Sequence, residues 1–273
     1  FIQMKILINN NDLNEALYSA TNLGFVPTMG SLHKGHISLI KNSLRQCSQT
    51  IVSIFVNPTQ FNNQKDYLRY PRNNKLDLSI LKKLGVDFVF MPNKKNVYYS
   101  KQKPKIKLNK KDKILCAKYR KGHFEGVIDV MSRLTEMIKP KKIFMGEKDF
   151  QQLYLVKKYI EKKNKSKIIP CKTIRDNNKL ALSSRNLLLS KKELIKAGKI
   201  AKDLNFFKKK LIKKKNIKKL LMIKKNELKQ LYNINIEYLE LRKDIDLKNT
   251  NKIKNSRIFF AYYLNKIRLI DNF

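Results

Sequence analysis

The chain alternates short apolar runs with segments whose apolar residues recur every three or four positions. A short run such as GFVPT at 24–28 is typical of a buried strand. Recurrence like that of Ile37, Ile40 and Leu44 puts one apolar face on a helix. The pattern predicts strands at 24–28, 51–56, 86–91, 142–145 and 168–174, and helices at 36–47, 76–84, 127–138 and 150–162.

Glycine and proline residues refine these limits. Gly85 is expected to end the second helix as its C-cap, and Pro140 follows the third helix. Pro170 lacks an N–H, so the strand at 168–174 is expected at a sheet edge or at a bulge. Strand and helix in alternation imply right-handed crossovers, so we expect an α/β fold with a mostly parallel sheet.

The pattern of apolar and polar residues changes after about Asp176. Residues 191–231 are rich in lysine and have a helical period, and they precede three short strand-like runs at 234–241, 257–264 and 266–270. This arrangement predicts a smaller C-terminal α+β domain. We therefore expect two domains, at 1–175 and 176–273.

Basic residues greatly outnumber acidic ones. The chain has 61 Lys and Arg against 21 Asp and Glu, a formal net charge of +40. Such a balance raises binding to nucleic acid or to acidic membranes. Lysine, asparagine and isoleucine are abundant together and share A/T-rich codons, and the lysines are spread along the chain. We attribute the charge to compositional drift and expect no specific nucleic-acid partner, although a basic nucleic-acid-binding protein stays an alternative.

The N-terminal segment and the cysteines indicate a cytoplasmic protein. No apolar run approaches the roughly 18 residues of a membrane span. The start of the chain, up to Ile8, is too short for a signal-peptide core, and Met4 is the expected natural start. Cys47, Cys116 and Cys171 lie far apart, without a C-x-x-C pair, so reduced thiols are expected.

The segment at 27–36 (PTMGSLHKGH) leaves a predicted strand and enters a helix. Gly30 and Gly35 let a ligand approach the backbone, and a helix N-terminus attracts phosphate. His33 and His36 share one face of the first turn, where imidazoles can stabilise the charge of a leaving phosphate group. They could instead be capping or surface histidines. Two of the chain's three histidines lie here, which favours the functional interpretation.

Several strings resemble one enzyme family. The H-x-G-H pattern is similar to the adenylate-forming nucleotidyltransferase superfamily, and the longer PTMGSLHKGH resembles the pantothenate synthetase family. Further matches follow in the family's order and span nearly the whole chain. They are FVNPTQF at 55–61, DYLRYPR at 66–72, RKGHF at 120–124, GEKDFQQL at 146–153, Ile174-Arg175, LSSRN at 182–186 and RLIDN at 268–272.

The chain departs from the family pattern at three places. Lys121 stands where the family usually has proline, and Asn177 to Lys179 replace an acidic, glycine-containing loop. The stretch at 262–266 replaces a more glycine-rich one. These departures affect expected loop geometry and the C-terminal domain. None removes a residue to which we assign chemistry.

The resemblance implies a Rossmann-like N-terminal domain and a C-terminal domain that closes over the nucleotide. It implies a ligase that uses Mg²⁺ and ATP to adenylate (R)-pantoate, then joins the pantoyl group to β-alanine and releases AMP and pyrophosphate. It also implies a homodimer. A related H-x-G-H enzyme such as a cytidylyltransferase is the alternative within the superfamily. The pair of Gln60 and Gln152, together with the GEKDFQQL string, argues against that alternative.

The matched strings also assign the site. Amides that follow a strand can bind a hydroxy acid, and an Arg can hold a carboxylate. We expect catalytic roles for His33, His36, Lys148 and Arg185. We expect ATP to contact Met29, Gly30, Ser31, Leu32, His33, Lys34, Gly35, His36, Gly146, Glu147, Lys148, Asp149, Ile174, Leu182, Ser183, Ser184 and Arg185. Pantoate or β-alanine is expected at Asn57, Gln60, Arg120 and Gln152, and Mg²⁺ at Asp149. Alternatively, Asn57 starts a turn, and Asp149 and the serines are helix caps.

Overall fold

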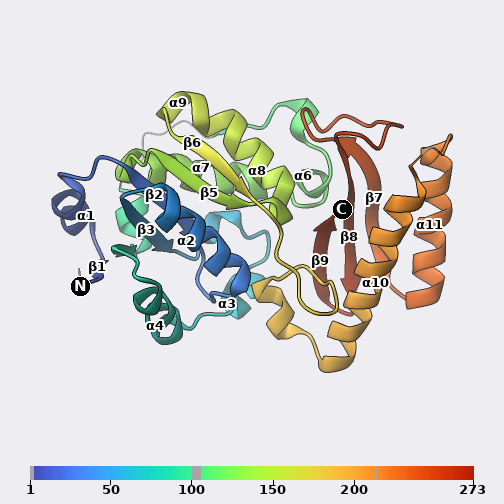
Figure 1. Ribbon diagram of the computed structural model, residues 1–273, viewed down its shortest axis with the longest axis horizontal. Coiled ribbons are helices and arrows are strands. Elements are labelled where there is room, and N and C mark those ends of the chain that lie inside the picture. The colour runs from blue at the N-terminus through green and yellow to red at the C-terminus, as the bar shows by residue number, and fades with distance from the viewer. Residues whose placement is uncertain (1–2, 100–105, 213) are drawn as a thin grey trace. The chain divides into compact units, whose positions relative to one another are not determined.

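The computed structural model describes residues 3–99, 106–212 and 214–273 and divides into two compact units, Phe1–Lys172 and Thr173–Phe273 (Figure 1). The first unit has a six-stranded parallel sheet flanked by helices, and the second has a three-stranded antiparallel sheet with two long helices. The predicted α/β class is therefore confirmed. Among the described residues, no helix is both long and apolar enough to cross a membrane.

The sheet of the first unit is parallel throughout. Its inner strands carry near-continuous apolar runs because both of its faces are covered; Phe25, Val26 and Ile51 are fully buried. The edge strand carries Pro170, as expected for a residue without an N–H. The strand order is β1 (Lys5–Leu7), β4 (Phe88–Phe90), β3 (Gln49–Ile54), β2 (Leu23–Thr28), β5 (Lys142–Gly146) and β6 (Lys167–Cys171).

Helices cover both faces of this sheet (Figure 1). On one face, Leu39, Ile40 and Leu81 pack with strand residues in one apolar cluster. On the other face, three helices pack against one another. The first face carries α2 (Lys34–Gln46) and α4 (Asn74–Leu84), and the second carries α1 (Asn10–Leu17), α7 (His123–Ile138) and α8 (Phe150–Val156). Short helices α3 (Gln64–Arg69), α5 (Lys94–Val97), α6 (Cys116–Tyr119) and α9 (Lys162–Asn164) lie in the connections.

The sequence signals explain most helix limits. Gly85 ends α4 in the left-handed conformation, with φ +73°, as its predicted C-cap role requires. The helix predicted at 150–162 is interrupted, because α8 passes into a π-helical turn at Lys157–Glu161 before α9. The strand β1 was not predicted. It has three residues, of which Leu7 alone is buried, so it offers no periodic pattern.

The strand order determines where the chemistry-bearing segments meet. The chain leaves β2 toward β3 and leaves β5 toward β6, which lie on opposite sides, so a topological switch point falls between β2 and β5. Ligands of open α/β sheets bind beyond the carboxyl ends of the strands at such a point. The segments 29–36, 55–61 and 147–153 follow the carboxyl ends of β2, β3 and β5, three neighbours in the sheet.

The second unit has its own core. Phe260 and Tyr262 of the sheet are buried with Leu204 and Leu228 of the helices. The antiparallel strands are β7 (Asn235–Lys243), β8 (Ser256–Leu264) and β9 (Ile267–Asn272), and the helices are α10 (Lys191–Lys210) and α11 (Ile217–Tyr232).

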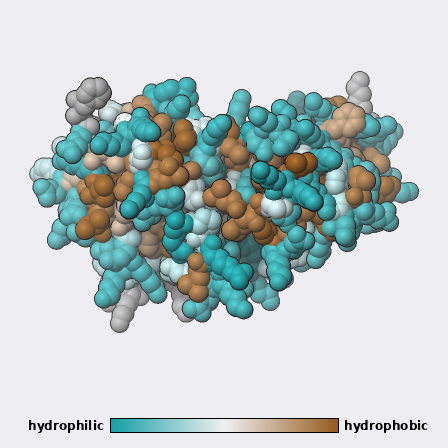
Figure 2. Space-filling model, turned by 90° about the horizontal axis from the view of Figure 1, so that it is seen from below, coloured by the Kyte–Doolittle hydropathy of each residue, from teal (hydrophilic) through white to brown (hydrophobic). Residues whose placement is uncertain are grey.

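Figure 2 shows hydrophilic residues spread over one face of the molecule, with hydrophobic groups scattered between them, in keeping with the lysine-rich composition.

Helix α2 approaches the sheet closely at Gly24 of β2. A Cβ at this position would lie 2.1 Å from Ser43 Oγ and 2.9 Å from Cys47 Sγ, both on the α2 side. The Ser43 hydroxyl is fully buried and shares a 2.8 Å hydrogen bond with Thr50 Oγ1, so it is not free to move away. Gly24 therefore sets the packing distance between α2 and the sheet.

We expect Gly24→Ala to lower the free energy of unfolding by about 1–3 kcal/mol, because overpacking forces neighbouring side chains and backbone to shift. Urea denaturation followed by circular dichroism measures this. Thr21→Ala, at an exposed position just before the strand, is the control and should change the value by less than about 0.5 kcal/mol. Equal stability of Gly24→Ala and the wild type would show that the packing is looser than described.

Candidate active site

The loop after β2 turns sharply. Thr28 Oγ1 donates to the Ser53 carbonyl oxygen at 2.6 Å and accepts from the Gly30 N–H at 3.2 Å. Gly30 and Ser31 both have positive φ, +78° and +53°. A Cβ on Gly30 would lie 3.0 Å from a carboxylate oxygen of Asp77. Gly30 is thus required both by its conformation and by the close approach of that carboxylate.

Asp77 holds this loop from the first turn of α4. It is 1% exposed, and its two carboxylate oxygens accept the backbone N–H groups of Ser31 at 2.7 Å and Leu32 at 2.8 Å. Hydrogen bonds to an ionised acceptor are about twice as strong as neutral ones. Sequence analysis missed Asp77. The available signal was an acidic residue four positions before Leu81, on the buried side of an amphipathic helix.

The two histidines of the loop cap α2 and bond to each other's backbone. His33 Nδ1 accepts from the Gly35 N–H at 3.1 Å, and His36 Nδ1 accepts from the His33 N–H at 3.3 Å. The ring centroids are 4.0 Å apart. A neutral imidazole that accepts at Nδ1 carries its proton at Nε2. This geometry assigns the Nε2–H tautomer to both rings and leaves two N–H donors at the start of the helix.

The surroundings keep both rings neutral. The pKa of His33 is lowered to about 4, first by burial and then by the Lys148 ammonium, while Asp149 acts in the opposite direction. The pKa of His36 is likewise lowered to about 3, mainly by burial and to a lesser extent by His33 and Lys148. Both histidines are therefore uncharged donors at neutral pH. The capping role and the ligand-binding role are compatible, because capping uses Nδ1 and leaves Nε2.

Lys148 and Asp149 follow β5 in the 3₁₀ turn Glu147–Asp149. Lys148 Nζ lies 3.4 Å from Asp149 Oδ1, and the Asp149 side chain is 46% exposed. Within the described ranges, no group of three or more His, Cys, Asp or Glu side chains could hold a metal ion. Asp149 fits Mg²⁺ as a single protein ligand, because this ion commonly takes one or two carboxylates together with substrate phosphates.

Asn57, after β3, is a buried support. It is 1% exposed, and its amide nitrogen donates to Gln60 Oε1 at 3.3 Å and to the Gly126 carbonyl oxygen at 3.2 Å. Its amide oxygen accepts from the Thr59 N–H at 3.3 Å and from the Tyr98 hydroxyl at 2.8 Å. The side chain caps the 3₁₀ turn Pro58–Gln60, as the structural interpretation of Asn57 anticipated. Its hydrogen-bonding capacity is used within the protein.

Gln60 links two of the motif segments. Its Nε2 lies 2.9 Å from Met29 Sδ, so the segment after β3 contacts the loop after β2. The paired glutamines of α8 differ from each other. Gln151 is buried and holds the segment before Arg120, since its amide bonds to the Cys116 N–H at 3.0 Å and to the Ile114 carbonyl oxygen at 2.7 Å. Gln152 is half-buried, and its side chain forms no hydrogen bond to a described residue.

Arg120 is held by a histidine that sequence analysis left without a role. Arg120 Nη1 lies 2.8 Å from His123 Nε2, and His123 Nδ1 lies 2.7 Å from the Gln60 carbonyl oxygen. The carbonyl accepts only, so Nδ1 carries the proton, and Nε2 accepts from the guanidinium. His123 is 7% exposed. The RKGHF match was the signal that could have identified it.

The remaining expected residues belong to the second unit, where they are anchored locally. Ser183 accepts from the Arg185 N–H at 3.3 Å and caps the 3₁₀ turn Ser184–Leu188. The Leu182 N–H donates to the Ile174 carbonyl oxygen at 3.0 Å. Next to Ile174, Arg175 forms a two-pronged ion pair with Asp271, at 2.7 and 2.8 Å.

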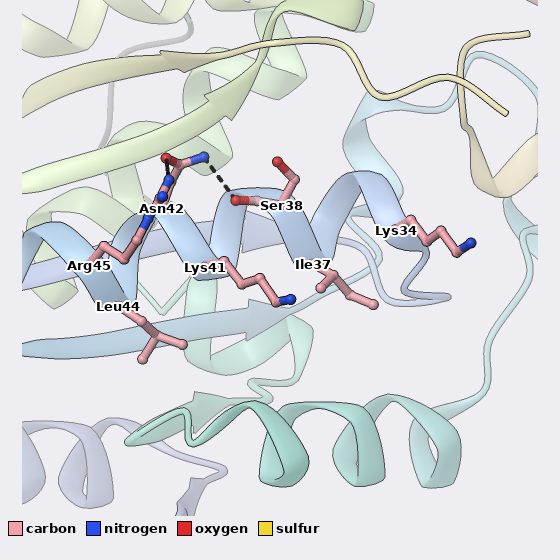
Figure 3. A pocket seen from close by; sticks show the side chains of 7 residues that line it. All are labelled: Lys34, Ile37, Ser38, Lys41, Asn42, Leu44 and Arg45. Atoms are coloured by element: carbon pink, nitrogen blue, oxygen red, sulfur yellow. Dashed lines mark hydrogen bonds between the residues drawn. The ribbon is translucent and has the colours of Figure 1, made fainter. Parts of the chain in front are cut away.

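A hollow of about 700 Å³ lies along the outer side of α2 (Figure 3). Lys34 is the member of its lining that belongs to the expected ATP loop. Within the hollow, Arg45 Nη2 donates to Asn42 Oδ1 at 2.7 Å, and Asn42 Nδ2 donates to the Ser38 carbonyl oxygen at 3.0 Å. The hollow is lined by Lys34, Ile37, Ser38, Lys41, Asn42, Leu44 and Arg45. Apart from Lys34, its lining residues lie outside the motif segments.

Comparison with known proteins identifies the family. The sequence profile described as pantoate-beta-alanine ligase matches residues 5–273. The pantothenate synthetases of Endomicrobium trichonymphae and Flavobacterium psychrophilum are each 39% identical, over 98% and 95% of this chain and 97% and 94% of their own lengths.

Solved structures agree with the sequence comparison. Pantothenate synthetase from Thermus thermophilus superposes with a TM-score of 0.92 at 30% identity, covering 99% of each chain. The pantoate-beta-alanine ligase of Francisella tularensis, complexed with beta-gamma ATP and beta-alanine, has a TM-score of 0.83 at 37% identity, covering 99% of this chain and 97% of its own. With a match over nearly its full length in both sequence and fold, this chain belongs to the pantoate-β-alanine ligase family.

Proposed function

We propose that this chain condenses (R)-pantoate with β-alanine at the expense of ATP, through a pantoyl-adenylate intermediate. Membership of the ligase family supports this, and so does the ATP and β-alanine complex of the Francisella relative. The observation that carries the proposal is the meeting of motif segments at one sheet edge, where Gln60 Nε2 contacts Met29 Sδ. This contact supports the proposal that the ATP loop and the pantoate site would adjoin.

At the nucleotide side, the loop Met29–His36 would bind ATP. The pantoate carboxylate attacks the α-phosphorus, forming an O–P bond while the bond to pyrophosphate breaks. His33 and His36 would donate Nε2–H bonds to phosphate oxygens, and Lys148 would add its positive charge. Donors fixed in place before the reaction stabilise developing charge without reorganising. The family resemblance assigns further ATP contacts to Ile174, Leu182, Ser183, Ser184 and Arg185, with Arg185 as a further cation.

At the acid side, Gln60 and Gln152 would bind the hydroxyl and carboxylate of pantoate, and Arg120 would hold a substrate carboxylate. Asn57 would act through Gln60, whose amide it orients, because its own amide is fully used. The amine of β-alanine then attacks the pantoyl carbonyl carbon, forming the amide bond as the bond to AMP breaks. The chain's contribution is alignment of reactants and exclusion of water from the mixed anhydride.

Further features follow from the family resemblance and belong to the same proposal. Mg²⁺ would enter with ATP, with Asp149 as its protein ligand, and when bound it would neutralise phosphate charge. We also propose a homodimer, a cytoplasmic location and a lid role for the second unit.

An assay of AMP release tests the activity. We expect purified protein to form AMP from Mg-ATP only when pantoate and β-alanine are both present in the turnover reaction. The control replaces ATP with CTP, which should give no CMP. Equal turnover with CTP, or with an unrelated acceptor in place of β-alanine, would favour a different nucleotidyltransferase.

Histidine resonances test the neutral donor tautomers. We expect ¹⁵N shifts of His33 and His36 to report the Nε2–H form and to show no titration between about pH 5 and 8, since both pKa values lie at about 4 or below. In the unfolded chain, each histidine takes up a proton near pH 6.5, whereas in the folded chain both stay neutral down to about pH 4. The folded state is therefore not penalised by these histidines above pH 6.5, and it loses stability as the pH falls below that value. A midpoint near 6.5 for either ring would contradict the assignment.

The role of Asp77 predicts a selective effect on ATP. We expect Asp77→Asn to raise the KM for ATP by about tenfold or more, because an amide cannot accept both the Ser31 and Leu32 N–H groups, and a bond to a charged group contributes about 1.5–3 kcal/mol. The KM for β-alanine should stay near the wild-type value. Steady-state kinetics with each substrate varied provides the measurement.

Asp87→Asn is the matched control. Asp87 is half-buried and also accepts a backbone N–H, from Thr50 at 2.7 Å, at the amino end of β3 and so away from the motif segments. Its loss should lower the melting temperature without changing the KM for ATP. If both variants change that KM alike, Asp77 is a general structural residue and not a support of the ATP loop.

A further inference from the structure

The 3₁₀ turn that carries Gln60 rests on the first turn of α7. Two hydrogen bonds join them in opposite directions. His123 Nδ1–H donates to the Gln60 carbonyl oxygen at 2.7 Å, and Asn57 Nδ2–H donates to the Gly126 carbonyl oxygen at 3.2 Å. Between these bonds, the two backbones approach each other at Gly126.

The approach at Gly126 leaves no room for a side chain. A Cβ there would lie 2.5 Å from the Thr59 carbonyl oxygen and 3.0 Å from Gln60 Cα. These are backbone atoms, which cannot rotate aside as a flexible side chain can. The φ of Gly126 is not positive, so its helical conformation does not require glycine, and glycine is less favourable than alanine inside a helix. The close approach of the turn is therefore the reason for glycine.

We propose that Gly126 and His123 are positioning residues for Gln60, and that the first turn of α7 fixes how deeply the Gln60 amide projects into the pantoate site. This inference rests on the proposed function. Gln60 is 9% exposed and its Nε2 already contacts Met29 Sδ, so little space is available for readjustment. Relieving a 2.5 Å contact requires a backbone shift of several tenths of an ångström or more, applied directly at Thr59 and Gln60.

Gly126→Ala tests the proposal. We expect its Kd for pantoate to rise by about tenfold or more, which is the scale for losing one hydrogen bond between the displaced Gln60 amide and a charged ligand group. The Kd for ATP should stay within about twofold, as the Gly30–Leu32 backbone is held by Asp77 and not by α7. Calorimetric titration with pantoate, and separately with a non-hydrolysable ATP analogue, measures both values.

Gly24→Ala is the matched control. It also introduces a methyl group into a contact shorter than 3.0 Å, but between β2 and α2 at the amino end of the strand. Its loss of stability should leave the affinity for pantoate unchanged. If Gly126→Ala and Gly24→Ala weaken pantoate binding equally at comparable melting temperatures, the effect is general loosening and the proposal is wrong.

Variants of His123 keep the test valid if Gly126→Ala does not fold. The amide nitrogen of His123→Asn can replace Nδ1–H and donate to the Gln60 carbonyl, whereas His123→Leu removes the donor. We expect His123→Asn to bind pantoate within about threefold of wild type and His123→Leu to bind at least about tenfold more weakly, beyond the roughly fivefold loss of one neutral hydrogen bond. Equal affinities of these two variants would overturn the positioning role.

The two levels of the proposal fail in different ways. If wild-type protein neither binds pantoate nor releases AMP, the proposed function fails. If the wild type is an active ligase and Gly126→Ala keeps the wild-type Kd for pantoate, the function stands and the positioning role of α7 is wrong.

Discussion

Parallel pairing of β2 with both β3 and β5 is the constraint on which the candidate site depends. Parallel strands end at the same edge of a sheet, so residues distant in sequence leave it side by side. After β2 the chain continues to β3 on one side, and after β5 it continues to β6 on the other side. The switch point between β2 and β5 is where ligands bind in sheets of this kind. Because β2 pairs with both strands, the loop of His33 and His36 leaves the sheet between the segments of Gln60 and Lys148.

Buried polar side chains hold the motif segments in fixed positions at that edge of the sheet. Asp77 satisfies two N–H groups of the β2 loop, Asn57 holds Gln60, and His123 joins Gln60 to Arg120. Each of these supporting side chains is at least nine-tenths buried. An enzyme that aligns two reactants and stabilises a leaving pyrophosphate needs rigid donors more than a nucleophile of its own. The buried polar side chains that hold the proposed site residues supply that rigidity.

Features that depend on neighbouring residues in the sequence could be predicted, whereas features that depend on distant residues could not. The inner strands and the longer helices were predicted because their apolar period is strong and local. The strand β1 lies beyond such reasoning, since its pairing with β4 is a contact made 83 residues away, between Lys5 and Phe88. The same holds for Asp77, whose partners lie 45 and 46 residues earlier.

Candidate site residues could be selected from the matched strings, but the strings did not show which of these residues bond within the protein. Gln151 and Gln152 are adjacent and identical in type, yet the Gln151 side chain holds a backbone segment, whereas the Gln152 side chain forms no hydrogen bond to a described residue. Which of them is available depends on the packing of α8, and adjacent helical residues point about 100° apart. The tautomers of His33 and His36 likewise follow from the capping geometry and not from residue type.

The glycines show how compositional drift and the fold constrain each other. Glycine codons begin with two guanines, and the chain keeps only eight glycines. Ten other described residues adopt positive φ, and seven of them are Lys or Asn, the types that drift supplies. Among them are Lys179 and Asn265, in the two stretches where the family is richer in glycine. Asparagine tolerates this conformation well, and lysine does so at a modest cost.

Four of the described glycines stand where a Cβ would have little or no space. At Gly24, Gly30, Gly126 and Gly198, an added Cβ would lie 3.0 Å or less from a neighbouring atom. A positive φ costs roughly 1–2 kcal/mol for other residues, which a protein can offset elsewhere. A collision with a fixed backbone displaces whatever that backbone carries, and at Gly126 it carries Gln60. Loss of glycine is therefore tolerated at exposed turns, and it is opposed wherever the glycine determines the distance between two elements that build the site.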